Sequence, residues 1–162
     1  MNTEAQKIVA TLRLIPLSRE GGWFRQTWQS PATLQSGRGA GSAIYFLLTT
    51  DDFSALHRLR TAEIWHYYAG DPVLHWQLDP TAGTSISTML GRDVLAGEVA
   101  QLIVSANIWH GGRLVVGGAH GWALLGCTMA PAWDEREFEL GERAALLREF
   151  PAAAAHIRGL TR

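Results

Sequence analysis

The sequence contains little charge, little lysine and little cysteine, and each shortage excludes a class of protein. Charged residues make up 18% of the 162 residues, the formal net charge is −1, and the only lysine is Lys7. Proteins that bind a nucleic-acid backbone cluster Lys and Arg, and no such cluster is present, so we expect no nucleic-acid partner. Cys127 is the only cysteine, which excludes an intrachain disulfide and predicts a buried, inert thiol in a cytoplasmic protein.

Long apolar runs are also missing. The N-terminal residues MNTEAQKIVATLRL hold no stretch long enough for a signal peptide or a membrane span, so we expect no membrane partner. Apolar residues nevertheless form 47% of the chain, which is enough for a sizeable core. The length predicts a single domain over residues 1–162.

From about residue 17 to residue 130 the chain consists of short runs rich in Val, Ile, Thr and aromatic residues. Turn signals such as GRGAGS, AGDP and GGAH separate these runs. The runs predict strands at 22–28, 42–49, 54–60, 63–69, 73–79, 85–90, 99–104, 112–117 and 121–128. Strands at this spacing are typical of antiparallel sandwiches and barrels, so the predicted fold class is mainly all-β.

Helical periodicity is confined to the two ends of the chain. Ile8 and Leu12 lie one helical turn apart and predict a short amphipathic helix over about residues 4–13. The C-terminal segment LGERAALLREFPAAAAHIRGLTR predicts helix over about residues 139–159, broken at Pro151. We therefore expect a β barrel with short N- and C-terminal helices.

The stretch FSALHRLRTAEIWHYYAGDP, residues 53–72, places polar side chains among aromatic ones. Two of them, His57 and Glu63, are followed much later by His110 in VSANIWHGGRLVV. The three side chains can converge only if their strands lie side by side around a barrel. Such a cluster is either a hydrogen-bonded core network or a site that does chemistry, and three groups on inward faces favour the site.

Alternation along the strand assigns the neighbours of Glu63 to two faces. Trp65 and Tyr67 share the face of Glu63, whereas His66 lies on the other face, where a structural role is expected. Trp65 should therefore line the cavity, where an aromatic wall can bind a flat or sugar-like ligand. The role of His75, in VLHWQLD, stays open.

Two segments resemble the motifs of the cupin superfamily. Residues 57–70 resemble G-x5-H-x-H-x3,4-E-x6-G, with Leu59 at the second histidine, and the segment that ends at His110 resembles G-x5-P-x-G-x2-H-x3-N. Further segments, among them EGGWFRQTW, SAIYFLLT and GWALLGCTMAPAWDEREFELGER, resemble a single-domain cupin branch of largely undefined function. The resemblance spans about residues 10–160. It implies an antiparallel double-stranded β-helix, the cupin or jelly-roll barrel, and a homodimer.

The resemblance also implies a metal site. His57, Glu63 and His110 occupy ligand positions, while Leu59 replaces the fourth ligand. Two imidazoles and one carboxylate suffice for a divalent transition metal such as Zn, Ni, Fe or Mn, which the lost ligand should leave weakly held. Without metal, the trio resembles the acid–base groups of sugar-nucleotide epimerases of the cupin fold, with Tyr67 or Tyr45 as proton donor.

Arg25 is a further candidate for ligand binding. An arginine in an apolar strand needs an anionic partner, either Glu20 or Glu63 or a ligand carboxylate or phosphate. The predicted function is therefore a barrel that binds a small sugar-like or carboxylate-bearing molecule. We expect an enzyme of isomerase or epimerase type or one that uses a metal; the alternative is a binding or sensing module without turnover.

Overall fold

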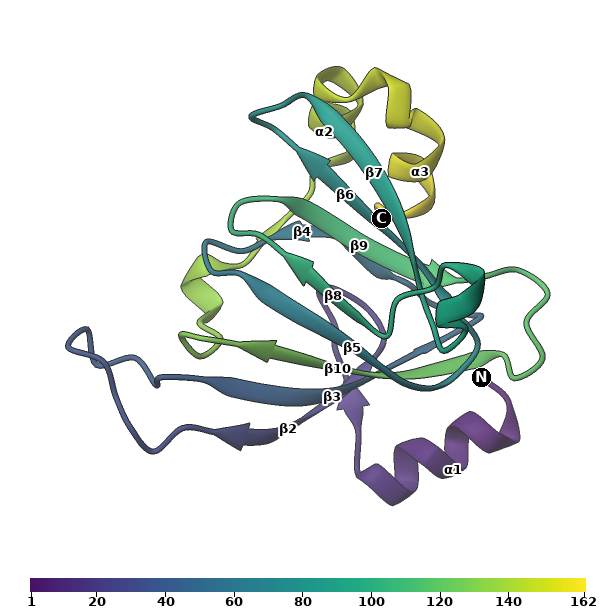
Figure 1. The fold of residues 1–162 in the computed structure, drawn as a ribbon, viewed down its shortest axis with the longest axis horizontal. Helices are drawn as coiled ribbons and strands as arrows, with labels where there is room; N and C mark the ends of the chain where they lie inside the picture. The colour runs from purple at the N-terminus through teal and green to yellow at the C-terminus, as the bar shows by residue number, and fades with distance from the viewer.

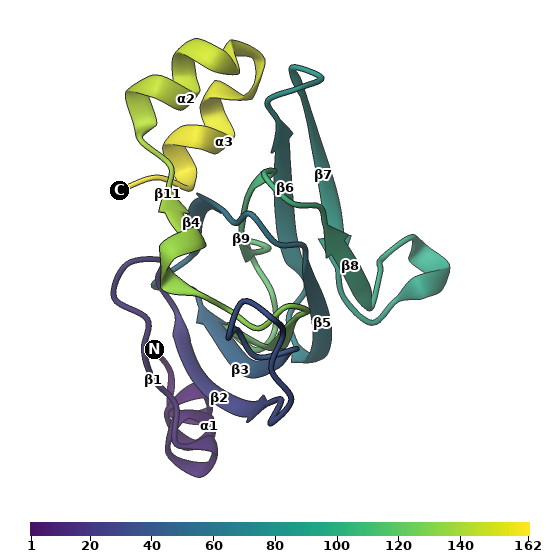
Figure 2. The ribbon, with the colours of Figure 1, turned by 90° about the vertical axis from the view of Figure 1, so that its left-hand side faces the viewer.

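The computed structural model describes residues 1–162, which form two antiparallel β-sheets around one interior (Figures 1 and 2). The six-stranded sheet has the order β1-β2-β3-β10-β5-β8, and the five-stranded sheet has the order β11-β4-β9-β6-β7. The strands are β1 (Ile15–Pro16), β2 (Trp23–Gln29), β3 (Ser42–Thr49), β4 (Ser54–Arg58), β5 (Glu63–Gly70), β6 (Val73–Asp79), β7 (Thr84–Leu90), β8 (Gln101–Val104), β9 (Trp109–Leu114), β10 (Trp122–Met129) and β11 (Glu139–Leu140). The predicted mainly β, jelly-roll architecture is confirmed.

The strand pattern places each predicted strand close to an observed one. The largest displacement is at β9, which begins at Trp109 instead of residue 112, so that His110 lies inside a strand. Two glycines obscure this strand in the sequence, because glycine has low strand propensity. In the structure a Cβ at Gly111 would lie 2.6 Å from the Ser54 carbonyl oxygen, and one at Gly112 would lie 3.2 Å from the Leu74 carbonyl oxygen. Close packing between neighbouring strands therefore requires glycine at 111 and leaves little room for a Cβ at 112.

One helix covers the outer face of the six-stranded sheet. Helix α1 (Thr3–Leu12) begins at Asn2, whose side chain accepts a hydrogen bond from the Ala5 backbone N–H. Its apolar side packs against Leu47 and Trp122 on the outside of the sheet, and it lies below β2 and β3 in Figure 1. Arg13, with a φ of 53°, ends the helix.

The C-terminal segment covers the outer face of the five-stranded sheet (Figure 1). Its helices are α2 (Arg143–Glu149), the 3₁₀ turn η3 (Pro151–Ala153) and α3 (Ala154–Gly159). They bury Leu146 and Ile157 against Leu56, Leu78 and Trp109. The two remaining 3₁₀ turns are η1 (Val94–Ala96) and η2 (Glu135–Glu137).

The predicted C-terminal helix starts too early. Residues 139–140 form β11, which pairs with β4, and helix begins only at Arg143, where the Glu142 carboxylate caps the first backbone N–H groups. The backbone N–H and C=O groups at the free edge of β4 can pair with an extended segment, and residues 139–140 would lose these hydrogen bonds if they were helical. None of the helices is both long and apolar enough to cross a membrane.

Candidate metal centre

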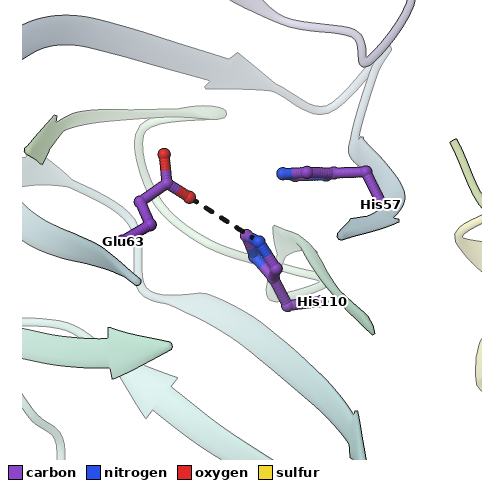
Figure 3. Close-up of side chains that lie close together, drawn as sticks. All are labelled: His57, Glu63 and His110. Carbon is purple, nitrogen blue, oxygen red and sulfur yellow. Dashed lines mark ion pairs between the residues drawn. The ribbon is translucent and has the colours of Figure 1, made fainter. Parts of the chain in front are cut away.

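Three strands bring His57, Glu63 and His110 together inside the barrel. His57 and His110 lie opposite each other on the paired strands β4 and β9, and Glu63 begins β5 in the facing sheet. All three are buried, and one ligand atom from each lies within 4.8 Å of the other two. The His110 Nε2 atom is 3.7 Å from the Glu63 Oε2 atom, and the His57 ring points towards this pair (Figure 3). The convergence expected from the sequence is therefore present.

Neighbouring groups fix the orientation of two of these side chains. The Nδ1 atom of His57 lies 2.8 Å from the Ala55 carbonyl oxygen, which can only accept, so Nδ1 carries the proton and Nε2 keeps its lone pair. The Trp65 indole N–H donates to the Glu63 Oε2 atom at 2.7 Å. Partners of this kind hold metal ligands in position in known metal sites.

Burial shifts the protonation equilibria of the trio formed by His57, Glu63 and His110. Desolvation lowers the pKa of His57 and lowers that of His110 well below its ordinary value, so both imidazoles are neutral at pH 7. Burial also raises the pKa of Glu63 to about 7. Neutral imidazole is the form that binds a metal, and a bound cation would favour the ionised carboxylate. The donor set thus fits a divalent transition-metal ion.

The spacing of the donors supports the same fit. Ligand bonds of about 2.0–2.2 Å allow two ligands of one ion to be at most about 4.4 Å apart. The Glu63–His110 distance of 3.7 Å meets this limit, and the 4.8 Å span of the trio exceeds it slightly. Small side-chain movements would therefore suffice to close the trio around an ion.

A cavity of about 410 Å³ opens onto two of these residues, His57 and Glu63. Leu59 lies beside them, and the carbon-rich side chains of Phe24 and Ile44 contribute to the walls. Such a volume is typical of sites for small organic ligands.

Glu20 also lines this cavity. From the sequence it was expected only as a possible ion-pair partner of Arg25. Its carboxylate is largely buried, accepts a hydrogen bond from the Ser54 hydroxyl at 2.6 Å and lies 3.9 Å from the His57 Nε2 atom. Burial raises the pKa of Glu20 to about 7. The only signal in the sequence is a glutamate directly before two glycines, in EGGWF.

Arg25 and Tyr45 do not lie in the cavity. They sit on the outer face of the six-stranded sheet, where the guanidinium carbon lies 5.7 Å from the centre of the Tyr45 ring. Arg25 forms no ion pair with Glu20 or Glu63, which corrects the partner expected from the sequence. Both faces of β2 carry aromatic residues, so alternation alone could not show that the Phe24 face is the inner one.

Trp65 and Tyr67 lie on the inner face but not at the cavity. Trp65 is buried beneath Glu63 and supports it through the indole N–H, so it does not form the aromatic wall predicted for it. The Tyr67 hydroxyl donates to the Gly70 carbonyl oxygen at the opposite end of β5. The sequence placed both residues on the correct face but could not give their depth along the barrel.

The two remaining candidate histidines occupy different environments. His66 lies on the outer face, where its Nε2 atom is 2.6 Å from the Thr128 hydroxyl. His75 lies inside, fully buried, with its ring stacked on His110 at a centroid distance of 5.5 Å. Burial lowers the pKa of His75 to about 3, and neither ring nitrogen has a hydrogen-bond partner. His75 therefore extends the histidine cluster into the barrel.

Comparison with known proteins assigns the chain to a family. The Cupin_5 family model, described as "Cupin superfamily (DUF985)", matches residues 6–141, and the chain belongs to this family. No curated protein matches the chain.

Solved structures extend the comparison. The chain is similar to a protein from Shewanella oneidensis, with a TM-score of 0.90, 32% identity and coverage of 98% of this chain and 97% of the other. For a hypothetical protein from Leishmania major the TM-score is 0.87 at 29% identity, with coverage of 97% of this chain and 98% of the other. For oxalate decarboxylase from Bacillus subtilis, a protein with Mn(II) centres, the TM-score is 0.56 at 14% identity, with coverage of 91% of this chain and 37% of the other. This last similarity shows a shared fold alone.

Proposed function

We propose that this chain is a metal-dependent cupin enzyme that binds one divalent transition-metal ion through His57, Glu63 and His110. Its substrate would be a small organic molecule with carboxylate or sugar-like hydroxyl groups, held in the adjoining cavity. The observation that carries the proposal is the convergence of three buried donors from three strands, all within 4.8 Å of one another.

The cost of burying the trio supports a functional role. Desolvation penalises each charged form, and the buried Nδ1 atom of His110 has no hydrogen-bond partner. A site that served stability alone would gain from apolar residues of similar volume. Retained polar groups that face a cavity instead fit the binding of a cation and of a molecule beside it.

When bound, a divalent metal polarises a substrate oxygen and stabilises the negative charge that develops there. The residues of the chain would hold and orient the substrate. Arg19 lines the cavity and can form a charge-assisted hydrogen bond with a carboxylate, and the Gln26 side chain can bind hydroxyl groups. Phe24 and Ile44 give the cavity apolar walls that limit water.

The metal-free epimerase mechanism has less support. It requires a proton donor across the substrate from the histidine base, and the sequence offered Tyr67 and Tyr45 for this role. The Tyr67 hydroxyl donates a hydrogen bond to the Gly70 carbonyl oxygen at the far end of β5, and Tyr45 lies on the outer face. Neither tyrosine lines the cavity.

Metal uptake tests the proposal directly. The purified chain would be stripped with a chelator, loaded in turn with Mn²⁺, Fe²⁺, Ni²⁺ and Zn²⁺, and assayed for bound metal by elemental analysis. We expect one ion per wild-type chain and loss of binding in Glu63→Gln and His110→Gln. His66→Gln is the matched control, because this histidine lies on the outer face of the same strand as Glu63.

Two results would contradict the metal site: no uptake of any of these metals by the wild type, or equal uptake by His110→Gln. Turnover needs a separate test. Metabolites would be compared in a deletion strain complemented with wild type or with Glu63→Gln. If the chain is an enzyme, its substrate should accumulate only in the strain that carries Glu63→Gln. If the chain is a binding module without turnover, no precursor should accumulate in either strain.

We also propose that the chain forms a homodimer. Strands β7 and β8 are sheet edges, and each exposes an isoleucine, Ile86 at 56% and Ile103 at 60%. Exposed edge strands with apolar side chains are commonly covered by a partner. Light scattering should give twice the chain mass of 17.8 kDa, and a monomer mass at all concentrations would contradict the dimer.

A further inference from the structure

The proposed metal site has one donor fewer than the motif that it resembles. Leu59 stands at the position of the second motif histidine and lines the cavity with an aliphatic side chain. His57, Glu63 and His110 therefore leave part of an ion's surface without a protein ligand. A further side chain of the cavity could fill this place.

Glu20 reaches the site from a different element, the turn that precedes β2. Its Oε2 atom lies 3.9 Å from the His57 Nε2 atom, close to the 3.7 Å that separates Glu63 from His110. Two ligands of one ion can lie this far apart, since each bond is about 2.0–2.2 Å long. Glu20 is outside the group whose donor atoms all lie within 4.8 Å of one another, so its side chain would have to turn towards the ion to bind it. The carboxylate is 13% exposed and forms no ion pair with a lysine or arginine.

The other oxygen of the same carboxylate is already anchored. Glu20 Oε1 accepts a hydrogen bond from the Ser54 hydroxyl at 2.6 Å, and Ser54 is fully buried in β4. Ligating carboxylates in metal sites are commonly held in this way, with one oxygen bonded to the protein and the other free. The free oxygen here is the one that faces His57.

The turn that carries Glu20 has a well-defined backbone. Gly21 and Gly22 follow it with φ values of 108° and 75°, which favour glycine. A Cβ at Gly21 would lie 2.2 Å from the Phe53 carbonyl oxygen, so the turn packs directly on the chain before β4. The Glu20 carbonyl oxygen accepts a hydrogen bond from the Ala55 N–H at 2.9 Å. These contacts tie Glu20 to the strand that carries His57.

From these contacts we infer that Glu20 supplies the fourth protein ligand of the metal, in place of the motif histidine that Leu59 replaces. The inference rests on the proposed metal binding. The resulting set has two imidazoles and two carboxylates, and the two negative charges balance a divalent cation. Carboxylate ligands suit Mn²⁺ better than a third imidazole does, so the site should be less selective for Ni²⁺ and Zn²⁺ over Mn²⁺ than a three-histidine site.

The test measures metal affinity and not turnover. Metal-free wild type, Glu20→Gln and Ser54→Ala would be titrated with Mn²⁺ and with Co²⁺, and the visible spectrum of the Co²⁺ form would report the number and kind of ligands. Removal of an outer-shell partner costs about 10–100-fold in metal affinity. We expect about 10-fold from Ser54→Ala and more than about 100-fold from Glu20→Gln, together with a changed Co²⁺ spectrum. Glu139→Gln, an exposed carboxylate beside β4, is the matched control and should bind as wild type.

A rescue variant separates ligand loss from a damaged fold. Adding Leu59→His to Glu20→Gln returns an imidazole to the motif position and should restore affinity. If Glu20→Gln fails to fold, Ser54→Ala still decides the question. If Glu20→Gln folds and its metal affinity and Co²⁺ spectrum are unchanged, the inference is overturned and the proposed trio stays intact. If Glu20→Gln does not fold, the same result in Ser54→Ala overturns the inference. Absence of binding by wild type and Glu139→Gln would overturn both.

Discussion

The two ends of the barrel interior are both buried, but they are chemically opposite. The far end is filled by apolar side chains that pack into one cluster, among them Leu48, Val73 and Leu90. The near end holds His57 and Glu63, whose charged forms are both penalised by desolvation. One interior thus combines a core that stabilises the fold with a polar cluster that costs stability.

The difference shows which end is required for folding. Apolar burial contributes about 25 cal/mol for each Å² removed from water, so the far end carries stabilisation. A buried ionisable group without a close opposite charge is destabilising. The stability that the near end costs agrees with the binding role proposed for it. Four experiments test this contrast between the two ends.

The largest effect on stability should come from the far end. Leu90→Ala removes a fully buried side chain from the core and should lower the free energy of unfolding by about 2–5 kcal/mol. Denaturant unfolding measures the loss. The folded variant should bind metal as wild type does, and a loss below about 1 kcal/mol would show that the far end is not the core.

The near end should make stability depend on pH in the metal-free chain. Glu63 has an ordinary pKa of 4.5 and a folded-state pKa of about 7, so the folded chain holds a proton between these values that the unfolded chain releases. Stability from this group therefore falls as pH rises from 4.5 to 7, by about 3 kcal/mol in total. Glu63→Gln should remove this fall.

The lowered pKa values of the buried histidines act in the opposite direction, because acid charges them only in the unfolded chain. Stability from the histidines rises with pH up to about 6.5. The comparison must therefore be between wild type and Glu63→Gln at each pH, in the presence of chelator. A constant difference from pH 4.5 to pH 7 would contradict the buried, uncompensated state of Glu63.

A smaller effect is expected between the two ends, at His75. His75→Phe keeps a ring that can pack against Trp65 and His110 but removes two buried nitrogens that have no partner. Metal-free stability should rise by about 1 kcal/mol, since an unsatisfied buried polar group costs about this much or more. Thermal unfolding measures it. A loss of the same size would show that the ring nitrogens have a partner in solution.

The smallest effect is expected on the outer face of the sheet, at Arg25. Arg25→Met removes a charge that has no ion pair and keeps a side chain that can cover Tyr45. Stability should change by less than about 0.5 kcal/mol, and metal binding should not change. A loss of metal or ligand binding would restore the ligand-binding role that the sequence suggested for Arg25.

Individual elements show how far the sequence could be read. Strands β3 and β6 have the predicted bounds, since their apolar runs end at clear turn signals. The start of β9 was missed because Gly111 and Gly112 weaken its pattern. The motif spacing identified His57, Glu63 and His110 as a group, but no spacing links Glu20 or His75 to them. Glu20 reaches the site from a turn that packs on β4, and His75 reaches it through the pairing of β6 with β9.

Alternation, turn residues and motif spacing are local or repeated features, so they were enough to predict the class of the fold and the three donors. Which face of each strand lies inside, and how deep each residue lies, depends on packing between distant strands. Alternation distinguishes two faces but does not orient them, so Arg25 and Tyr45 were assigned to the cavity that Phe24 and Ile44 line. Depth follows from strand register and barrel closure, which place Tyr67 at the far end and Glu20 beside His57.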